Sequence, residues 1–443
     1  MGTVDREILR LALPSIVSNI TVPLLGLCDV TIMGHVGGAT SIGAIAVGSM
    51  IFNVMYWLFV FLRMSTSGLT AQAYGASQWE ACRSTLHRSL TLALSFGVAI
   101  VVLQVPLRWL TFWLMQAEGE VAAACLPYYN ICIWGAPAVL GLYVLMGWLV
   151  GMQDTRKPMF IAISQNVVNI GLSLLLVVGF NMGIVGLAIG TLIAQWTGFI
   201  MGVVVAMKAS GRTRKKEEKG KVVPERKSGL SSLNLNIFLR TVCLVSVNLY
   251  FTSAGAAQGP LILAANTLLM QFFMLYSYIM DGFANAGEAL SGRYLGASDP
   301  AMLRQTVCRL FGWGTGVAIL FTAVYWMAGT ALLHLLTSDA NVVITATDYL
   351  PWAVLIPAAG MAAFVWDGIF IGTTLSRGML VSCFLATVTF FTLWLLLSPN
   401  QHNHALWIAL LAYLAMRGLV QTLLWVKRNP KIGIPTSGVR RRE

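Results

Sequence analysis

One acidic residue lies within an apolar stretch near the start of the chain. Asp29 belongs to residues 19–34, NITVPLLGLCDVTIMG, six residues after Pro23. A carboxylate at bilayer depth costs about 2.5–3.5 kcal/mol on insertion scales, so it normally faces a polar interior and serves ion or proton traffic. Pro23 removes one helical hydrogen bond, which gives this helix a place to bend. A titratable group beside a hinge at Pro23 predicts a switch that responds to ions or protons. The alternative is an acid at a helix end that reaches the membrane surface.

The composition sets the class of protein that positions this acid. Hydrophobic residues make up 57% of the 443 positions, charged residues 10%, and the mean hydropathy is +0.75. A soluble domain does not have this balance, whereas apolar runs of about 20 residues cross a bilayer as helices. We predict an all-α integral membrane protein with twelve transmembrane helices. The expected spans are residues 8–34, 42–70, 86–107, 126–151, 159–180, 184–207, 236–256, 261–288, 307–331, 347–372, 378–398 and 405–427.

The distribution of the 29 Lys and Arg residues predicts the orientation. Most of them lie at the two termini and in the even-numbered loops, so the positive-inside rule predicts that both termini and the central linker are cytoplasmic. This placement argues against nucleic acid as the reason for the net charge of +12. Three arginines, Arg63, Arg240 and Arg417, lie within or at the edge of apolar helices instead.

The chain also contains an internal repeat with a constant offset of 221 residues. This register predicts an N-lobe over residues 1–207 and a C-lobe over 236–427, joined by a basic linker (208–235) and followed by a basic tail (428–443). Six spans per repeat give both lobes the same orientation, with a pseudo-two-fold axis along the membrane normal and a central cleft. The matched pairs are Gly34 with Gly255, Gly38 with Gly259, Ala44 with Ala265, Gly75-Ala76-Ser77 with Gly296-Ala297-Ser298, Arg83 with Arg304, Tyr128 with Tyr349, Gly147 with Gly368, Gly151 with Gly372 and Arg156 with Arg377.

Two equivalent lobes around a cleft are typical of alternating-access transporters. The sequence has no phosphate-binding GxxxxGK[ST] loop, no HExxH and no GxSxG, so we do not expect an enzyme. We expect transport to be driven by an ion gradient rather than by ATP bound to this chain. The seven cysteines include no CxxC and lie in or beside apolar runs, which predicts neither a disulfide framework nor a metal site. We expect no cofactor.

Several segments together resemble one family of transporters. The runs LALPSIVSNITVPLLGLCDVTIMGHVG and FLRMSTSGLTAQAYGA are similar to the MATE (multidrug and toxic compound extrusion) transporters, in particular their DinF branch. Further matches are NVVNIGLSLLLVVG, NMGIVGLAIGTLIAQ, MDGFANAGEALSG, WDGIFIGTTLSRG and HALWIALLAYLAMRGL. The resemblance covers essentially the full length. It implies a V-shaped cleft and efflux of organic, often cationic or amphipathic, compounds in exchange for protons or sodium ions.

The resemblance also implies site residues in the N-lobe. Asp29 occupies the position of the family's proton-linked acid. The family's fifth helix usually carries an Asn followed four residues later by an Asp, and this chain has Asn169 followed by Ser173. Asn166, Asn169 and Ser173 share one helical face, so a polar strip remains without a second carboxylate. This departure favours protons over sodium, because a hard cation needs several oxygen ligands.

Three acids in the C-lobe have two interpretations. Asp281 and Glu288 are seven residues apart and share a helical face, while Asp367 lies where sodium-coupled relatives carry a functional Asp. These acids form either a second coupling or substrate site, or structural ion pairs with Arg240, Arg293 or Arg417.

The leading prediction is a proton-coupled antiporter for small organic compounds in a bacterial cytoplasmic (inner) membrane, acting as a monomer in the lipid bilayer. The alternatives are sodium-coupled antiport and a flippase for lipid-linked precursors. A major-facilitator transporter has the same six-plus-six layout, but the loop AQAYGASQWEACR lacks the charged Gly motif of that group. A membrane scaffold without transport would leave the buried acids unexplained.

Overall fold

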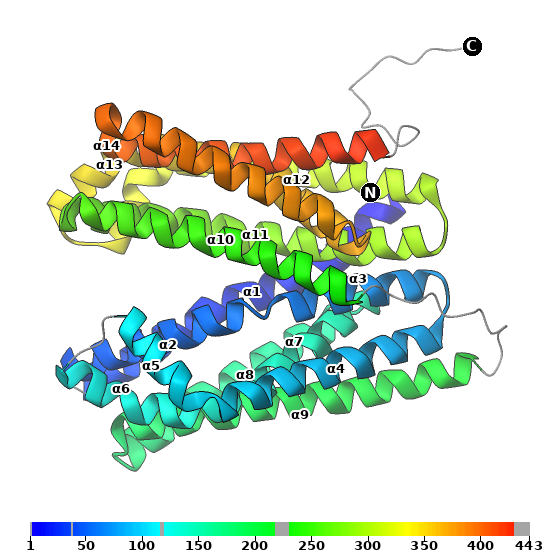
Figure 1. Cartoon of the computed structure of the whole chain (residues 1–443), viewed down its shortest axis with the longest axis horizontal. Helices are drawn as coiled ribbons and strands as arrows, with labels where there is room; N and C mark the ends of the chain where they lie inside the picture. Colours follow the sequence, from blue (N-terminus) through cyan, green and yellow to red (C-terminus); the bar gives the residue numbers. More distant parts are fainter. Residues whose placement is uncertain (1, 37–38, 116–118, 218–229, 429–443) are drawn as a thin grey trace. The chain divides into compact units, whose positions relative to one another are not determined.

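The protein is helical throughout the part of the chain that the structure describes. The structure is a computed structural model that describes residues 2–36, 39–115, 119–217 and 230–428. Within these ranges, the side chains of residues 22–25, 27, 30, 35, 36, 39, 212–217, 230 and 400 are not described. Helices joined by short turns account for the described residues (Figure 1), as the composition predicts.

The chain divides into two compact units. The N-unit comprises Leu13–Leu230, and the C-unit comprises Met1–Ala12 together with Ser231–Glu443. The predicted N-lobe began at residue 1, whereas the contacts place the first twelve residues with the C-unit. Helix α1 (Thr3–Val36) therefore contributes its first turns to one unit and the remainder to the other.

The N-unit is organised around helix α7 (Ala136–Gly151), which is buried along most of its length between α3, α4 and α9. Trp148 anchors it, donating from Nε1 to the carbonyl oxygen of Cys82 at 2.8 Å. The other elements are α2 (Ala39–Trp57), α3 (Phe61–Gly75), α4 (Trp79–Val102), α5 (Gln104–Leu114), α6 (Gly119–Cys132), η1 (Ile133–Gly135), α8 (Arg156–Leu174), η2 (Leu175–Gly179) and α9 (Gly183–Glu217).

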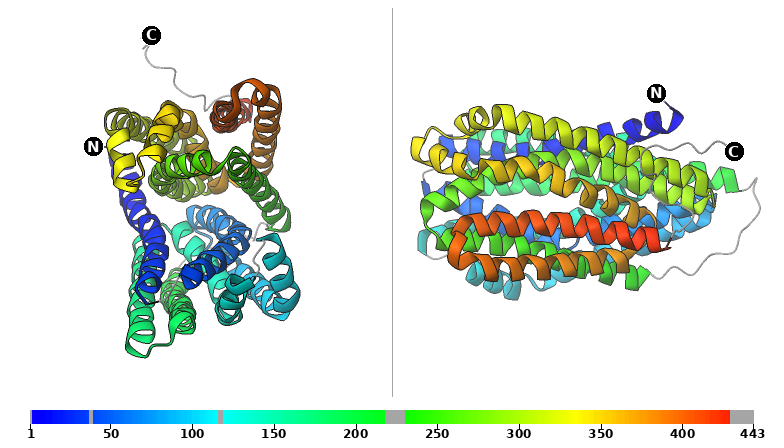
Figure 2. Two further views of the ribbon diagram at one scale, coloured as in Figure 1. Left: turned by 90° about the vertical axis from the view of Figure 1, so that its left-hand side faces the viewer. Right: turned by 90° about the horizontal axis from the view of Figure 1, so that it is seen from above.

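The C-unit has the corresponding arrangement around α13 (Ala340–Gly372), which packs against α11, α12 and α14. Within each unit the helices run side by side along a common direction (Figure 2). Helix α14 (Ser376–Arg428) consists of two helices, because the backbone at His402 is non-helical, with φ 45° and ψ −119°. The remaining helices are α10 (Leu230–Ala257), α11 (Pro260–Gly296) and α12 (Pro300–Leu336).

Matched glycines in the two units let equivalent helices approach closely. A Cβ atom on Gly147 of α7 would collide with the carbonyl oxygen of Arg63 in α3. A Cβ atom on Gly368 of α13 would collide in the same way with the carbonyl oxygen of Ala284 in α11. Each contact is related to the other by the 221-residue offset, so glycine is needed at both positions for the same steric reason.

Matched turns repeat the same relation. Ser77 and Ser298 have positive φ values of 58° and 56°, and Gln153 and Thr374 have values of 64° and 54°. Both pairs are 221 residues apart and follow long helices. Since a positive φ is uncommon outside glycine, the pairs show that the two units turn their chains in the same way. The repeat predicted from the sequence is therefore present in the three-dimensional structure.

The helices agree with the predicted spans and extend beyond most of them. Eleven described helical segments are long and apolar enough to cross a membrane. The remaining predicted span, residues 8–34, lies in α1, where several side chains are not described. Helix α9 continues to Glu217, into the predicted linker, of which residues 218–229 lie outside the described part. The predicted tail lies outside it from residue 429. Helix α5 was not predicted.

Candidate functional site

Asp29 is a buried acid in α1. The residue is 6% exposed, and its Oδ1 atom has no hydrogen-bond partner among the described residues. Tyr128 and Cys132 of α6 lie within electrostatic range of its carboxylate. Pro23 lies in the same continuous helix, but its side chain is outside the described part, so the predicted hinge stays a prediction.

The predicted polar strip lies on α8 and meets two neighbouring helices. Asn166 donates from Nδ2 to the carbonyl oxygen of Thr21 in α1 at 3.1 Å, about two turns before Asp29. Asn169 donates from Nδ2 to Oγ1 of Thr191 in α9 at 3.1 Å. The strip therefore connects the helix that carries the acid to α9.

Ser173 completes the strip at the α8–α9 contact. Gly190 of α9 packs against it so closely that a Cβ atom on that glycine would lie 2.8 Å from the Ser173 hydroxyl oxygen. Oγ of Ser173 and Oδ1 of Asn169 are buried and have no hydrogen-bond partner among the described residues. An unmade hydrogen bond in a buried position costs about 1–3 kcal/mol, so each such atom calls for a functional explanation. In functional sites, buried polar atoms of this kind form hydrogen bonds with water, with a protonated group or with the substrate.

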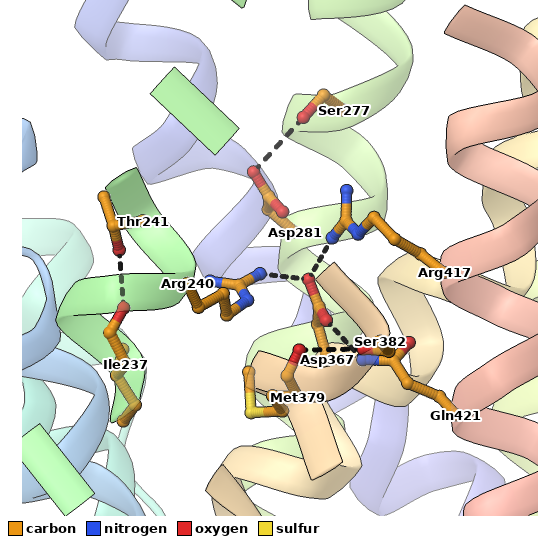
Figure 3. Close-up of polar contacts among 10 residues, drawn as sticks. All are labelled: Ile237, Arg240, Thr241, Ser277, Asp281, Asp367, Met379, Ser382, Arg417 and Gln421. Carbon is orange, nitrogen blue, oxygen red and sulfur yellow. Dashed lines mark hydrogen bonds and ion pairs between the residues drawn. The ribbon is translucent and has the colours of Figure 1, made fainter. Parts of the chain in front are cut away.

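The C-unit contains a buried ionic cluster centred on Asp367 (Figure 3). Arg240 of α10 and Arg417 of α14 both donate to Oδ2 of Asp367, the latter at 2.6 Å. Gln421, one turn beyond Arg417, donates to Oδ1 at 2.8 Å. The three helices α10, α13 and α14 thus meet at one carboxylate, which is 7% exposed.

This arrangement decides how Asp367 can be used. Two guanidinium groups and one amide engage both carboxylate oxygens, which stabilises the ionised acid. A sodium ion at the same oxygens would have to lie beside two fixed positive charges, which Coulomb repulsion opposes. The geometry favours the ion-pair interpretation of Asp367 over a cation site.

The other two predicted acids of the C-unit, Asp281 and Glu288, both lie on α11. Ser277 lies one turn before Asp281 on α11 and is 3.4 Å from its Oδ2 atom, and Asp281 is half-buried. Glu288 is 1% exposed, and its backbone carbonyl packs against Gly372. Arg293, one of the three predicted partners, pairs with Glu7 of α1 instead. The functional roles of Asp281 and Glu288 stay predictions.

One member of the ionic cluster was missed from the sequence. Gln421 is completely buried and bonds Asp367, although glutamine carries no charge that would single it out in an apolar helix. Its position four residues after Arg417 was the available signal, because side chains at this spacing share a helical face. No group of three or more His, Cys, Asp or Glu side chains that could hold a metal ion lies within the described ranges.

Comparison with known proteins gives the class that this fold and these sites define. The MatE family model matches residues 14–175 and 237–395, covering both units. The chain therefore belongs to the MatE family of membrane transporters. A second model, for the lipid II flippase MurJ, matches residues 118–254.

Individual relatives agree with this assignment. The chain is 38% identical over 430 residues to the DNA damage-inducible protein F of Escherichia coli K12, covering 95% of this chain and 92% of the relative. It is 24% identical over 356 residues to a probable multidrug resistance protein NorM of Thermotoga maritima, covering 77% and 74% of the two chains. A crystal structure of a MATE protein in the bent conformation has the same fold, with a TM-score of 0.84, 17% identity and coverage of 97% and 96%. The predicted resemblance and the two-lobe helical fold are confirmed.

Proposed function

We propose that this protein is a secondary active efflux transporter that exports organic compounds from a bacterial cell in exchange for protons. The observation that carries the proposal is the buried carboxylate of Asp29, whose Oδ1 has no partner among the described residues. A carboxylate held in this way at membrane depth favours taking up a proton, because the neutral acid has a smaller desolvation cost than the anion.

The proposed cycle uses this difference between the two forms of Asp29. The ionised form attracts a cationic or polar substrate and needs hydrogen-bond donors around it. Protonation removes the charge, weakens substrate binding and lets α1 repack, with Pro23 as the place where the helix bends. Moving one charge across the membrane contributes about 2.3 kcal/mol per 100 mV, which is enough to drive a modest substrate gradient.

The surroundings of the candidate acids support protons over sodium as the coupling ion. The strip on α8 offers amide and hydroxyl groups without a second carboxylate, and Asp367 is engaged by two arginines. A sodium ion needs several oxygen ligands, preferably with compensating negative charge. A single buried acid is sufficient for a proton.

The relatives support organic compounds as the substrate class. The protein from Thermotoga maritima and others among the relatives are named as multidrug resistance proteins, and we extend that class of substrate to this chain. We further propose that the protein works as a monomer in the cytoplasmic membrane with both termini in the cytoplasm, as the distribution of Lys and Arg predicts.

A flippase for lipid-linked precursors is the second candidate, because the MurJ model matches residues 118–254. Such a substrate carries anionic phosphates, which favour a cationic surface. Arg240 and Arg417 could supply positive charge, but both are buried and donate to Asp367. This pairing makes them weaker candidates for binding phosphate and supports the efflux proposal.

Transport in proteoliposomes tests the proposal. An imposed proton gradient is expected to drive export of a cationic dye by the wild type. Asp29→Asn is expected to bind the dye more weakly, because its amide is neutral like the protonated acid, and to lose at least about 90% of the flux even at saturating dye, because the amide carries no exchangeable proton. Glu80→Gln, which removes an exposed acid from the first turn of α4, serves as the matched control. Flux driven by a sodium gradient alone, or normal flux by Asp29→Asn, would contradict the proposal.

A further inference from the structure

The first turns of α1 pack as part of the C-unit, although most of this helix belongs to the N-unit. Val4, Ile8, Leu11 and Ala12 are all at most 4% exposed and recur at helical spacing. This spacing defines one apolar face that the C-unit covers. We call residues 3–12 the α1 head. The same helix carries Asp29 in the N-unit, so any movement of the head relative to the C-unit involves the helix of the coupling acid.

Glu7 fixes the α1 head to the end of α11. Its Oε2 accepts a hydrogen bond from the hydroxyl of Tyr294 at 2.7 Å, and its Oε1 lies 3.4 Å from Nη1 of Arg293. The Arg293 guanidinium also lies over the Tyr294 ring, 5.2 Å from its centroid. The 2.7 Å bond has the length of a charge-assisted hydrogen bond.

Asp5 fixes the same head to α12. Its Oδ1 accepts from the indole Nε1 of Trp313 at 3.2 Å, and its Oδ2 lies 3.8 Å from Nη1 of Arg309. Asp5 is 7% exposed, so this carboxylate is largely removed from water. Two acids of one helical turn therefore hold two different helices of the C-unit.

A structural joint follows the head directly. The boundary between the units falls between Ala12 and Leu13, and Pro14 is the next residue. Proline has no N–H to donate to the carbonyl of Arg10, four residues earlier, and its ring crowds the preceding turn. Bending of a helix is concentrated at such positions. The head can therefore change its direction relative to the rest of α1 without unfolding either part.

We propose that Asp5 and Glu7 form a latch that holds the α1 head on the C-unit in one access state of the transport cycle and opens when the protein leaves that state, with Pro14 as the joint. This inference rests on the proposed alternating-access transport and adds a conformational control to it. The ion pairs of the latch are partly exposed, with the Arg309 side chain 54% exposed, so they contribute little and break readily. The hydrogen bonds from Tyr294 and Trp313 supply the specific part of the attachment.

Two spin-label distances test the latch. A pair at Arg6 and Gln305, both in the C-unit, reports whether the head is docked, and a pair at His87 and Gln305 reports the access state; all three positions are exposed. Bioorthogonal labels leave the seven native cysteines unchanged. The wild type is expected to show two populations for each pair, with the docked fraction following one access state.

Removing the latch bonds is expected to shift both distributions together. Tyr294→Phe combined with Glu7→Gln should lower the ratio of docked to undocked head about fivefold or more, since a hydrogen bond to a charged group is lost. Glu80→Gln is the control and should leave both ratios unchanged. Unchanged distributions in the double variant, or an undocked head without a change of access state, would overturn the proposal. The measurement uses no ion gradient, so a protein that is driven by sodium instead of protons still gives a clear result for the latch.

Discussion

At the scale of single residues, the buried acids Asp29 and Asp367 have opposite environments. Asp29 has an oxygen without a hydrogen-bond partner among the described residues, whereas both oxygens of Asp367 receive charged or amide donors. The first environment suits a group that gains and loses a proton. The second suits a group that stays ionised and holds three helices together. The same residue type therefore has two proposed roles, set by its neighbours.

Asp367 gives a prediction about stability. Asp367→Asn leaves two buried guanidinium groups without their carboxylate, which is expected to cost about 3–5 kcal/mol and to lower the unfolding temperature in detergent. Asp339→Asn is the matched control, because Asp339 caps α13 by accepting from the backbone N–H of Asn341 at 2.9 Å, and asparagine caps helices equally well. An Asp367→Asn variant as stable as this control would show that the ionic cluster does not hold the helices together.

At the scale of helices, the repeat makes the central helices of both units depend on glycine. Gly147→Ala and Gly368→Ala each force a methyl group against a backbone carbonyl, so each is expected to destabilise the protein by about 1–3 kcal/mol. Gly171→Ala and Gly312→Ala are the controls, since a Cβ atom at either position has no neighbour within 4 Å. Thermal unfolding of the four variants measures the difference. Equal unfolding temperatures in all four would contradict the close packing of α7 on α3 and of α13 on α11.

The helices were also the level at which the sequence was most informative. Twelve apolar runs, the 221-residue offset and the matched glycines predicted the helices and the two-unit organisation, because each signal depends on composition and spacing within one segment. The break in α14 at His402 falls between the predicted spans 378–398 and 405–427. Helix α5 was not predicted, since it lies in a connection between two spans. The assignment of the α1 head to the C-unit depends on tertiary contacts of Asp5 and Glu7, which no local pattern reveals.

At the scale of the whole molecule, proton coupling requires that substrate and proton compete through one acid. Substrate binding to the protonated protein should therefore release a proton, because the two ligands favour opposite forms of Asp29. This linkage holds for binding alone and needs neither a membrane nor a gradient. A measurement of this linkage therefore tests the role of Asp29 without involving the later steps of the transport cycle.

The most direct test of the central claim is the number of protons released when a cationic substrate is added to the purified protein in weakly buffered detergent solution. At a pH low enough that Asp29 is protonated in the substrate-free protein, we predict about one proton per bound substrate for the wild type and for Glu80→Gln. For Asp29→Asn we predict none, at a substrate concentration that saturates this variant. Release of the same number of protons by Asp29→Asn would contradict the assignment of Asp29 as the coupling group. It would direct attention to Asp281 and Glu288 in the C-unit.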